Sequence, residues 1–194
     1  MDSFDQIRQE IIQHPMNKVF TDQETFPLYT ASSHAQILII GQAPGHQAQE
    51  SQIVRNDKSG DTLRSWLGVS KEEFYQTELI ALLPMDFYYP GKGEHGDLPP
   101  RKDFASYRHP RLLTLMPEIQ LTLLIGKYAQ DFYLKSYKKK NLTETVRSYQ
   151  EYLPDFFPLV HPSPLNFRRQ AKNPRFLKEV IPELQRLVAQ IKNS

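Results

Sequence analysis

Four short apolar runs place the strongest constraint on how this chain can fold. They are Ile37–Ile40, Leu79–Leu83, Leu121–Ile125 and Phe156–Val160. The first three are almost wholly aliphatic and of strand length, which is typical of strands buried on both faces of a parallel sheet. The fourth contains Pro158, which has no backbone N–H and therefore favours an edge position or a short strand.

Helical patterns lie between these runs, so strands and helices alternate along the chain. We expect helices at Phe4–His14, Ser59–Leu67 (with Ser59 as N-cap), Pro110–Met116, Lys127–Tyr137 and Pro174–Ile191. Pro182 falls inside the last of these and predicts a break or a kink. The alternation predicts an α/β fold with three layers (α/β/α) and a four-stranded, mainly parallel sheet. Because we find no repeat and no linker-like stretch, we expect residues 1–194 to form a single domain.

The composition narrows the class of protein. No apolar run approaches the ~20 residues that span a bilayer, and the acidic start MDSFDQIRQE does not resemble a signal peptide. The sequence has no cysteine, which excludes disulfides, thiolate nucleophiles and cysteine-bound zinc or iron–sulfur clusters. His46, His95 and His109 lack ligand-like spacing, so we assign no metal site and expect no cofactor. A reducing cytoplasm is the simplest location.

Positive charge is concentrated in the last third of the chain, although the net charge is only +2. The segment Phe156–Lys178 has no acidic residue, and it carries Arg168, Arg169, Lys172, Arg175 and Lys178. A second cluster is Lys138–Lys140. Such clusters neutralise phosphates in some proteins and form a solvated basic face in others.

The segments that follow the four runs are the candidate ligand loops, because open α/β sheets bind ligands at the carboxyl ends of their strands. After the first run comes Gly41–Gly45, where two glycines permit a close approach of the backbone and Pro44 stiffens the turn. This loop is neither a Walker A motif nor a dinucleotide fingerprint. The longest irregular stretch, Tyr88–Arg111, is either a functional loop or a surface excursion.

Two of these loops resemble the signature motifs of the uracil-DNA glycosylase superfamily. Gly41-Gln42-Ala43-Pro44-Gly45 is similar to the Gly-Glu-Ala-Pro-Gly motif of its thermophile-type branch, and His161-Pro162-Ser163-Pro164 is similar to its His-Pro-Ser-Pro loop. Their order, separation and place after the first and last strands also match. The resemblance extends over roughly Ile37 to Val188. The sequence also resembles an uncharacterised bacterial group within this superfamily. The resemblance implies a four-stranded parallel sheet flanked by helices.

The resemblance also implies roles for individual residues. A base glycosylase flips a nucleotide into a pocket and stabilises the departing base. His161 would donate a hydrogen bond to a base carbonyl oxygen, with Gln42 as the second catalytic residue. The expected substrate-binding residues are Gly41, Ala43, Pro44, Gly45, Glu50, Arg55, Asp86 and Phe87. The expected DNA-phosphate contacts are Ser163, Arg168, Arg169 and Lys172.

The sequence departs from the family at several of these positions. Some branches carry an Asp where Ala43 stands, and the closer branch has a Glu where Gln42 stands. Gln42 can orient a water but cannot act as a base, so we expect Glu50, or less readily Asp57 or Asp61, to supply a carboxylate. The four cysteines that hold an iron–sulfur cluster in the closer branch are absent.

The base-reading positions differ as well. Arg55 falls where the family stacks an aromatic ring on the base, and a guanidinium can also stack there. Phe87, Tyr88 and Tyr89 are an alternative aromatic wall. The second strand lacks the Asn of uracil-specific branches, and Asp86 could accept from a base N–H instead.

Two functional hypotheses follow. The first is a monofunctional, metal-free DNA base-excision glycosylase that acts on uracil or another damaged base, as a monomer by analogy. The second is a catalytically impaired protein that binds nucleic acid or nucleotides on the same fold. An unrelated α/β hydrolase is disfavoured, because the sequence has no Gly-x-Ser-x-Gly motif.

Overall fold

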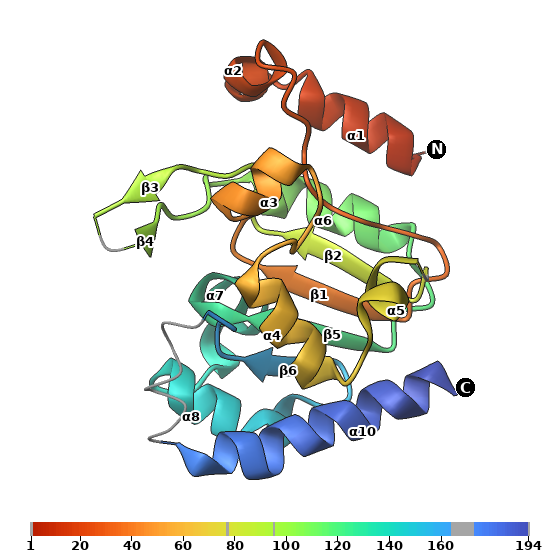
Figure 1. Ribbon diagram of the computed structural model, residues 1–194, viewed down its shortest axis with the longest axis vertical. Helices are drawn as coiled ribbons and strands as arrows, with labels where there is room; N and C mark the ends of the chain where they lie inside the picture. Colours follow the sequence, from red (N-terminus) through yellow and green to blue (C-terminus); the bar gives the residue numbers. More distant parts are fainter. Residues whose placement is uncertain (1, 77, 95, 164–172, 194) are drawn as a thin grey trace.

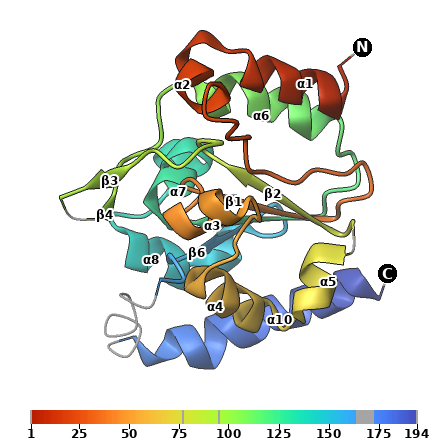
Figure 2. The same ribbon diagram turned by 45° about the horizontal axis from the view of Figure 1, so that its top comes forward.

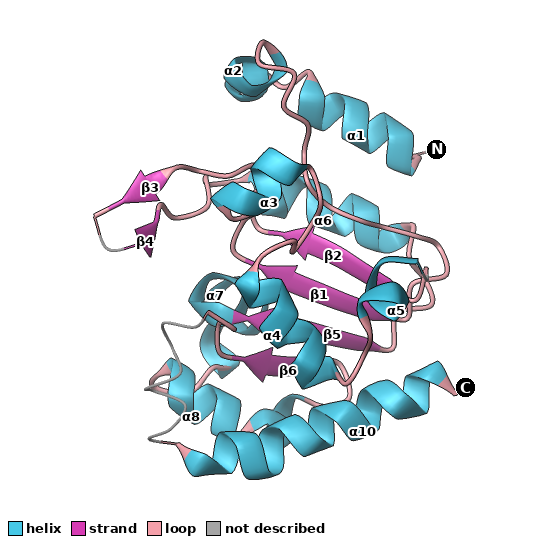
Figure 3. Cartoon of the chain, viewed as in Figure 1, coloured by secondary structure: helices cyan, strands magenta, loops and turns pink. Residues whose placement is uncertain are grey.

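The computed structural model describes residues 2–76, 78–94, 96–163 and 173–193. Its centre is a four-stranded sheet in which all neighbouring strands are parallel (Figures 1 and 3). The strands, in spatial order, are β2 (Ile80–Pro84), β1 (Ile37–Gly41), β5 (Leu121–Ile125) and β6 (Phe156–Leu159). The expected sheet is confirmed, and β6 with its Pro158 lies at an edge as expected.

Helices cover both faces of the sheet, as expected for three layers (Figure 2). Alternate residues of β1 face opposite ways, so Ile37 and Ile39 enter one core and Leu38 and Ile40 enter the other. The first core is closed by α4 (Lys58–Leu67), α5 (Lys71–Gln76), α8 (Leu142–Arg147) and α10 (Ile181–Lys192). The second is closed by α1 (Phe4–Ile12), α2 (Lys18–Thr21), α6 (Phe104–Thr114) and α7 (Gly126–Leu134).

Two helices differ from the sequence-based expectation at their N-termini. Helix α6 begins at Phe104, before Pro110, because Phe104, Arg108 and Leu112 recur at a spacing of four and form one buried face. Helix α4 is capped by Asp57 and not by Ser59. The Asp57 carboxylate accepts a hydrogen bond from the backbone N–H of Gly60 at 2.7 Å.

The helix changes character next to Pro182, where the sequence predicts a break or a kink, but it is not interrupted. Residues Phe176–Val180 form a π-helical turn, and α10 begins at Ile181 with Pro182 in its first turn. Proline fits there because its missing N–H has no intrahelical partner in the first turn of a helix. No helix in the described residues is long and apolar enough to cross a bilayer.

Two short elements lie beyond the sheet. Helix α3 (His46–Ser51) follows the loop after β1. A two-stranded hairpin of β3 (Lys92–Gly93) and β4 (Gly96–Asp97) projects from the long segment after β2 (Figure 1). On the outer side of β2, Thr30 exchanges both backbone hydrogen bonds with Leu82, at 3.0 and 3.1 Å.

The first turn of α4 packs directly on the backbone of Arg55. A Cβ at Gly60 would stand 1.8 Å from the carbonyl oxygen of Arg55 and 2.8 Å from its carbonyl carbon. Arg55 itself has a φ of 59°, in the left-handed region. The Nη1 atom of Arg64 lies 3.4 Å from the same carbonyl oxygen. These contacts fix the backbone of Arg55 beneath the helix.

Gly60→Ala is therefore expected to lower the free energy of unfolding by about 1–3 kcal/mol, because backbone atoms cannot yield to the new methyl group. In an unobstructed helix the same change would raise stability by up to about 1 kcal/mol. Urea denaturation measures the difference, with the exposed Ser65→Ala on the same helix as control. A stabilised Gly60→Ala protein would contradict this packing.

Candidate functional site

Backbone hydrogen bonds join the loops that follow β1 and β2. The N–H of Met85 donates to the carbonyl of Gly41 at 2.8 Å, and the N–H of Asp86 donates to the carbonyl of Gln42 at 3.1 Å. The pairing of the two strands thus continues into the loops. The first motif lies at the carboxyl edge of the sheet, where open α/β sheets bind ligands.

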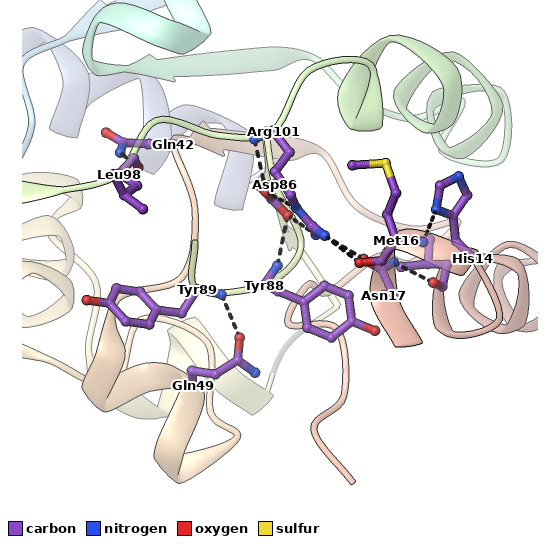
Figure 4. Close-up of polar contacts among 11 residues, drawn as sticks. His14, Met16, Asn17, Gln42, Gln49, Asp86, Tyr88, Tyr89, Leu98 and Arg101 are labelled. Carbon is purple, nitrogen blue, oxygen red and sulfur yellow. Dashed lines mark hydrogen bonds and ion pairs between the residues drawn. The ribbon is translucent and has the colours of Figure 1, made fainter. Parts of the chain in front are cut away.

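The side chain of Gln42 is held by the segment after the hairpin. Its amide donates to the carbonyl of Leu98 at 2.9 Å; the two residues lie together in Figure 4. The N–H of Leu98 in turn donates to the carbonyl of Gly91 at 2.9 Å, which closes the base of the hairpin. Within the described residues no donor is bonded to the Oε1 atom of Gln42, so this oxygen is available as an acceptor.

Gln42 and His161 meet at a hollow of about 130 Å³. A cavity of about 150 Å³ can take up benzene, so the hollow has the size of a single aromatic ring. It lies between the ends of β1, β5 and β6, and its walls are Gln42, Ile125, Gly126, Lys127, Tyr128, Leu142, Val160 and His161. The structure thus brings the two expected catalytic residues together. The wall from α7, Gly126 to Tyr128, belongs to the candidate ligand segment after the third run, although none of its residues was assigned a role there.

His161 is neutral at pH 7. Burial lowers its pKa to about 4, helped by the positive charge of Arg55 and opposed by the negative charge of Asp57. A neutral imidazole donates from one ring nitrogen and accepts at the other. His161 can therefore offer a hydrogen bond to an oxygen in the hollow without carrying a positive charge.

The two glycines of the first motif make room for side chains that come from the segment before α4. A Cβ at Gly41 would stand 2.1 Å from Nη2 of Arg55, and a Cβ at Gly45 would stand 3.1 Å from Oδ2 of Asp57. Arg55 and Asp57 line a second hollow with Gly41, Ala43, Pro44 and Gly45. Its volume is about 30 Å³, enough to hold a water molecule. The space that these two glycines leave is thus occupied by the side chains of Arg55 and Asp57.

Of the candidate carboxylates, Asp57 lines a hollow beside the first motif, whereas Glu50 does not. Glu50 lies on the exposed side of α3, 3.3 Å from Nδ1 of His46, and lines neither hollow. Asp57 lines the smaller hollow, and its charge raises the pKa of both Arg55 and His161 against the effect of burial.

Asp86 is bound to the protein itself and is not open to a base. Its Oδ2 and Oδ1 atoms accept from Nε and Nη2 of Arg101, both at 2.8 Å, and also from the backbone N–H groups of Arg101 and Tyr88 (Figure 4). Its side chain has no exposed surface. The expectation that Asp86 accepts from a base N–H is replaced by a structural role, because Arg101 and the backbone occupy both oxygens.

The residues after Asp86 do not form an aromatic wall at the hollow. Phe87 is fully buried against Tyr29 and His109. Tyr88 is also buried, stacked on Phe20. Both rings belong to the core behind the loop, so Phe87 as a substrate contact is not supported.

Tyr89 is the partly exposed member of this aromatic run. Its ring meets His46 edge-on, with centroids 5.4 Å apart. Its backbone N–H donates to Oε1 of Gln49 at 2.8 Å, which attaches α3 to the loop after β2 (Figure 4).

The expected phosphate contacts fall largely outside the described residues. Ser163 is described and is partly buried, two residues after His161, whereas Arg168, Arg169 and Lys172 lie outside. In the second basic cluster, Lys138 pairs with Asp131 and Lys139 pairs with Glu151. In the part of the chain that the structure describes, no group of three or more His, Cys, Asp or Glu side chains could hold a metal ion.

We expect Asp86→Asn to lower the free energy of unfolding by about 3 kcal/mol, because it leaves the Arg101 guanidinium without its anion in a mostly buried site. Urea denaturation measures the loss. The double variant with Arg101→Gln should recover part of it, since both charges are then removed. A loss below about 1 kcal/mol, typical of a surface pair, would show that the pair is not structural.

A buried histidine ties α6 and α7 to the end of β2. The Nε2 atom of His109 lies 3.0 Å from the carbonyl oxygen of Pro84, and Nδ1 lies 2.8 Å from the hydroxyl of Tyr133. A carbonyl only accepts, so Nε2 carries the proton and Nδ1 accepts from Tyr133. Burial lowers the pKa of His109 to about 4, and the ring is neutral at pH 7.

This burial predicts a loss of stability in mild acid. The unfolded chain protonates its histidines near pH 6.5 and the folded His109 only near pH 4, so the stabilisation is complete above pH 6.5 and is lost as the pH falls toward 4. The full effect is roughly 3 kcal/mol, and His161 acts in the same direction. Urea denaturation at pH 7, 5.5 and 4.5 should show a smaller fall for His109→Gln than for the wild type or the exposed His34→Gln. Equal falls in all three proteins would contradict it.

The fold and the motifs agree with comparisons to known proteins. A solved structure from Methanosarcina acetivorans, provisionally assigned as a uracil DNA glycosylase, matches with a TM-score of 0.52 and 17% identity. The match covers 85% of this chain and 96% of that chain, and at this identity it shows a shared fold. The sequence model of the Uracil DNA glycosylase superfamily matches residues 27–185, a range that includes both motifs and every strand of the sheet. The chain therefore belongs to the Uracil DNA glycosylase superfamily.

Proposed function

We propose that this protein is a DNA glycosylase that hydrolyses the N-glycosidic bond of uracil or another damaged base, with His161 and Gln42 at the reacting base. The observation that carries the proposal is the ring-sized hollow between these two side chains at the carboxyl edge of the sheet. Membership of the superfamily supports it. The description of the Methanosarcina acetivorans protein points in the same direction.

His161 would act on the departing base. As the glycosidic bond stretches, negative charge builds up on the base and is shared with its carbonyl oxygen. A ring N–H of the neutral His161 donates to that oxygen, and the donor is already in place before charge develops. The apolar walls of the hollow, Ile125, Leu142 and Val160, exclude water and strengthen this interaction.

Gln42 would orient the water or the base. Its amide N–H is bound to Leu98, which points the free Oε1 atom as an acceptor for a water or for a base N–H. An amide cannot take up a proton, so the reaction relies on a sugar cation reactive enough to capture an oriented water. Asp57, which lines the smaller hollow with Gly41 and Arg55, would offset the positive charge of that sugar.

The DNA strand would be held beyond the hollow. We propose that Ser163 contacts a phosphate that flanks the flipped nucleotide, and that Arg168, Arg169 and Lys172 continue this contact along the strand. We also propose that the protein acts as a monomer in the cytoplasm.

A second function, binding of nucleic acid without base release, is favoured by one observation. Among the described residues no carboxylate lines the larger hollow, where other branches of the superfamily place one in the first motif. This function predicts salt-dependent binding to DNA with no abasic product.

The proposed reaction is tested on labelled oligonucleotides that hold uracil, hypoxanthine, xanthine or a mismatch, in single and double strands. We expect an abasic product from at least one of them. His161→Ala should slow its release by about 10²–10³-fold, the usual effect of removing a preorganised donor. The exposed His34→Ala serves as the matched histidine control and should release base at the wild-type rate.

Three results are informative. Release of a base that depends on His161 supports a glycosylase and names its substrate. Release that is equally fast in His161→Ala would remove His161 from the mechanism. Binding that weakens with salt, with no release from any oligonucleotide, would establish the second function in place of the first.

A further inference from the structure

Arg55 presents a cation at the carboxyl edge of the sheet that the proposed reaction has not used. Its backbone is fixed in the left-handed region, against Gly60 and Arg64. From this backbone the side chain extends to Gly41. Its Nη2 atom lies 2.1 Å and its Cζ atom 3.3 Å from where a Cβ of residue 41 would stand. The guanidinium therefore rests on the end of β1.

This cation is desolvated and unpaired. Burial lowers the pKa of Arg55, more than the charges of Asp57 and Tyr75 raise it. Among the residues that the structure describes, no carboxylate lies within ion-pair distance of its guanidinium, and no acceptor is hydrogen-bonded to it. A partly buried charge without a partner is costly to the folded state. Such a group is expected where an anion binds during function.

The anion in question is a base held against His161, on the other side of the loop Gly41–Gly45 from Arg55. The charge of Arg55 is one cause of the low pKa of His161, so the two side chains act on the same region of the site. Gly41, on which the guanidinium rests, immediately precedes Gln42, which lines the larger hollow. A base held against His161 would thus take up its negative charge in the field of an unpaired cation.

We propose that Arg55 stabilises the departing base as an anion, and so acts with the neutral donor His161 in base release. The inference rests on the proposed function. The C1′–N bond breaks with its electron pair on the base, water adds to C1′, and the proton that the water loses ends on the base. Arg55 remains protonated throughout and takes no part in proton transfer. Its contribution is greatest for bases that are poor leaving groups, because these concentrate the most negative charge in the transition state.

The test compares two leaving groups in one sequence context. Uracil and 5-fluorouracil are placed in the same oligonucleotide, and single-turnover release is measured for the wild type, Arg55→Gln and Arg55→Lys. Fluorine makes the base a better leaving group, so it needs less stabilisation. We expect Arg55→Gln to slow uracil release at least about tenfold more than 5-fluorouracil release, and Arg55→Lys to recover part of the difference. Arg186→Gln, an exposed arginine of α10, is the matched control and should change neither rate.

A phosphate is the other anion that Arg55 could hold, and the same variants distinguish it. For a phosphate contact, Arg55→Gln would weaken DNA binding and reduce the salt slope by about one, with equal effects on the two bases. That result, or an equal slowing of both bases at unchanged affinity, would overturn the proposal. Removal of an unpaired charge should not destabilise the fold, which thermal unfolding of Arg55→Gln checks.

The inference and the proposed function fail in different ways. If the wild type releases neither base, nor any base of the wider panel, both are overturned. If the wild type releases base but Arg55→Gln changes the two rates by the same factor, only the inference is overturned. If Arg55→Lys is as slow as Arg55→Gln for uracil, the positive charge is not the active feature and the inference also fails.

Discussion

The buried ion pair of Asp86 and Arg101 is the interaction on which the arrangement of the site depends. A carboxylate with no exposed surface is tolerated only because a guanidinium and two backbone N–H groups bind both its oxygens. Arg101 also donates to the side chain of Asn17 and lies over the ring of Phe104 at 4.1 Å. The pair therefore joins three segments: the N-terminal segment, the loop after β2 and the start of α6. That loop is in turn hydrogen-bonded to the first motif through the N–H groups of Met85 and Asp86, so the ion pair also supports the backbone of Gln42.

This arrangement divides the carboxyl edge into two parts of different character. On the side of β1 and β2 the loops are bonded to each other, and Arg55 leaves room for about one water. On the side of β5 and β6 a ring-sized hollow opens next to His161. The first part holds the charge of Arg55 and the backbones of the two loops in place. The second part contains the open hollow beside His161. A site that needs preorganised donors beside a vacant pocket requires both.

Much of the fold could be predicted from the sequence, and less of the site could. The strands follow from apolar runs whose burial on both faces is unambiguous, and the edge position of β6 follows from Pro158. His161 and Gln42 follow from motifs at strand ends. The position of Arg55 on Gly41 could not be predicted, because it depends on a left-handed residue and on a contact across a loop. Asp86 was misassigned for a similar reason, since its partner Arg101 is fifteen residues away in an irregular segment and no periodic pattern marks the pair.

The two edges of the sheet also determine how this protein can meet other chains. Exposed strand edges are templates for strand addition by peptides or by other copies of a protein. Thr30 already takes up both backbone groups of Leu82, at the centre of β2. Pro158 removes a donor from the middle of β6 at the opposite edge. Neither edge presents a continuous ladder of free donors and acceptors, so the sheet resists growth by β-augmentation. The carboxyl edge of the sheet, where both hollows lie, is then left open beside edges that do not favour pairing with protein strands.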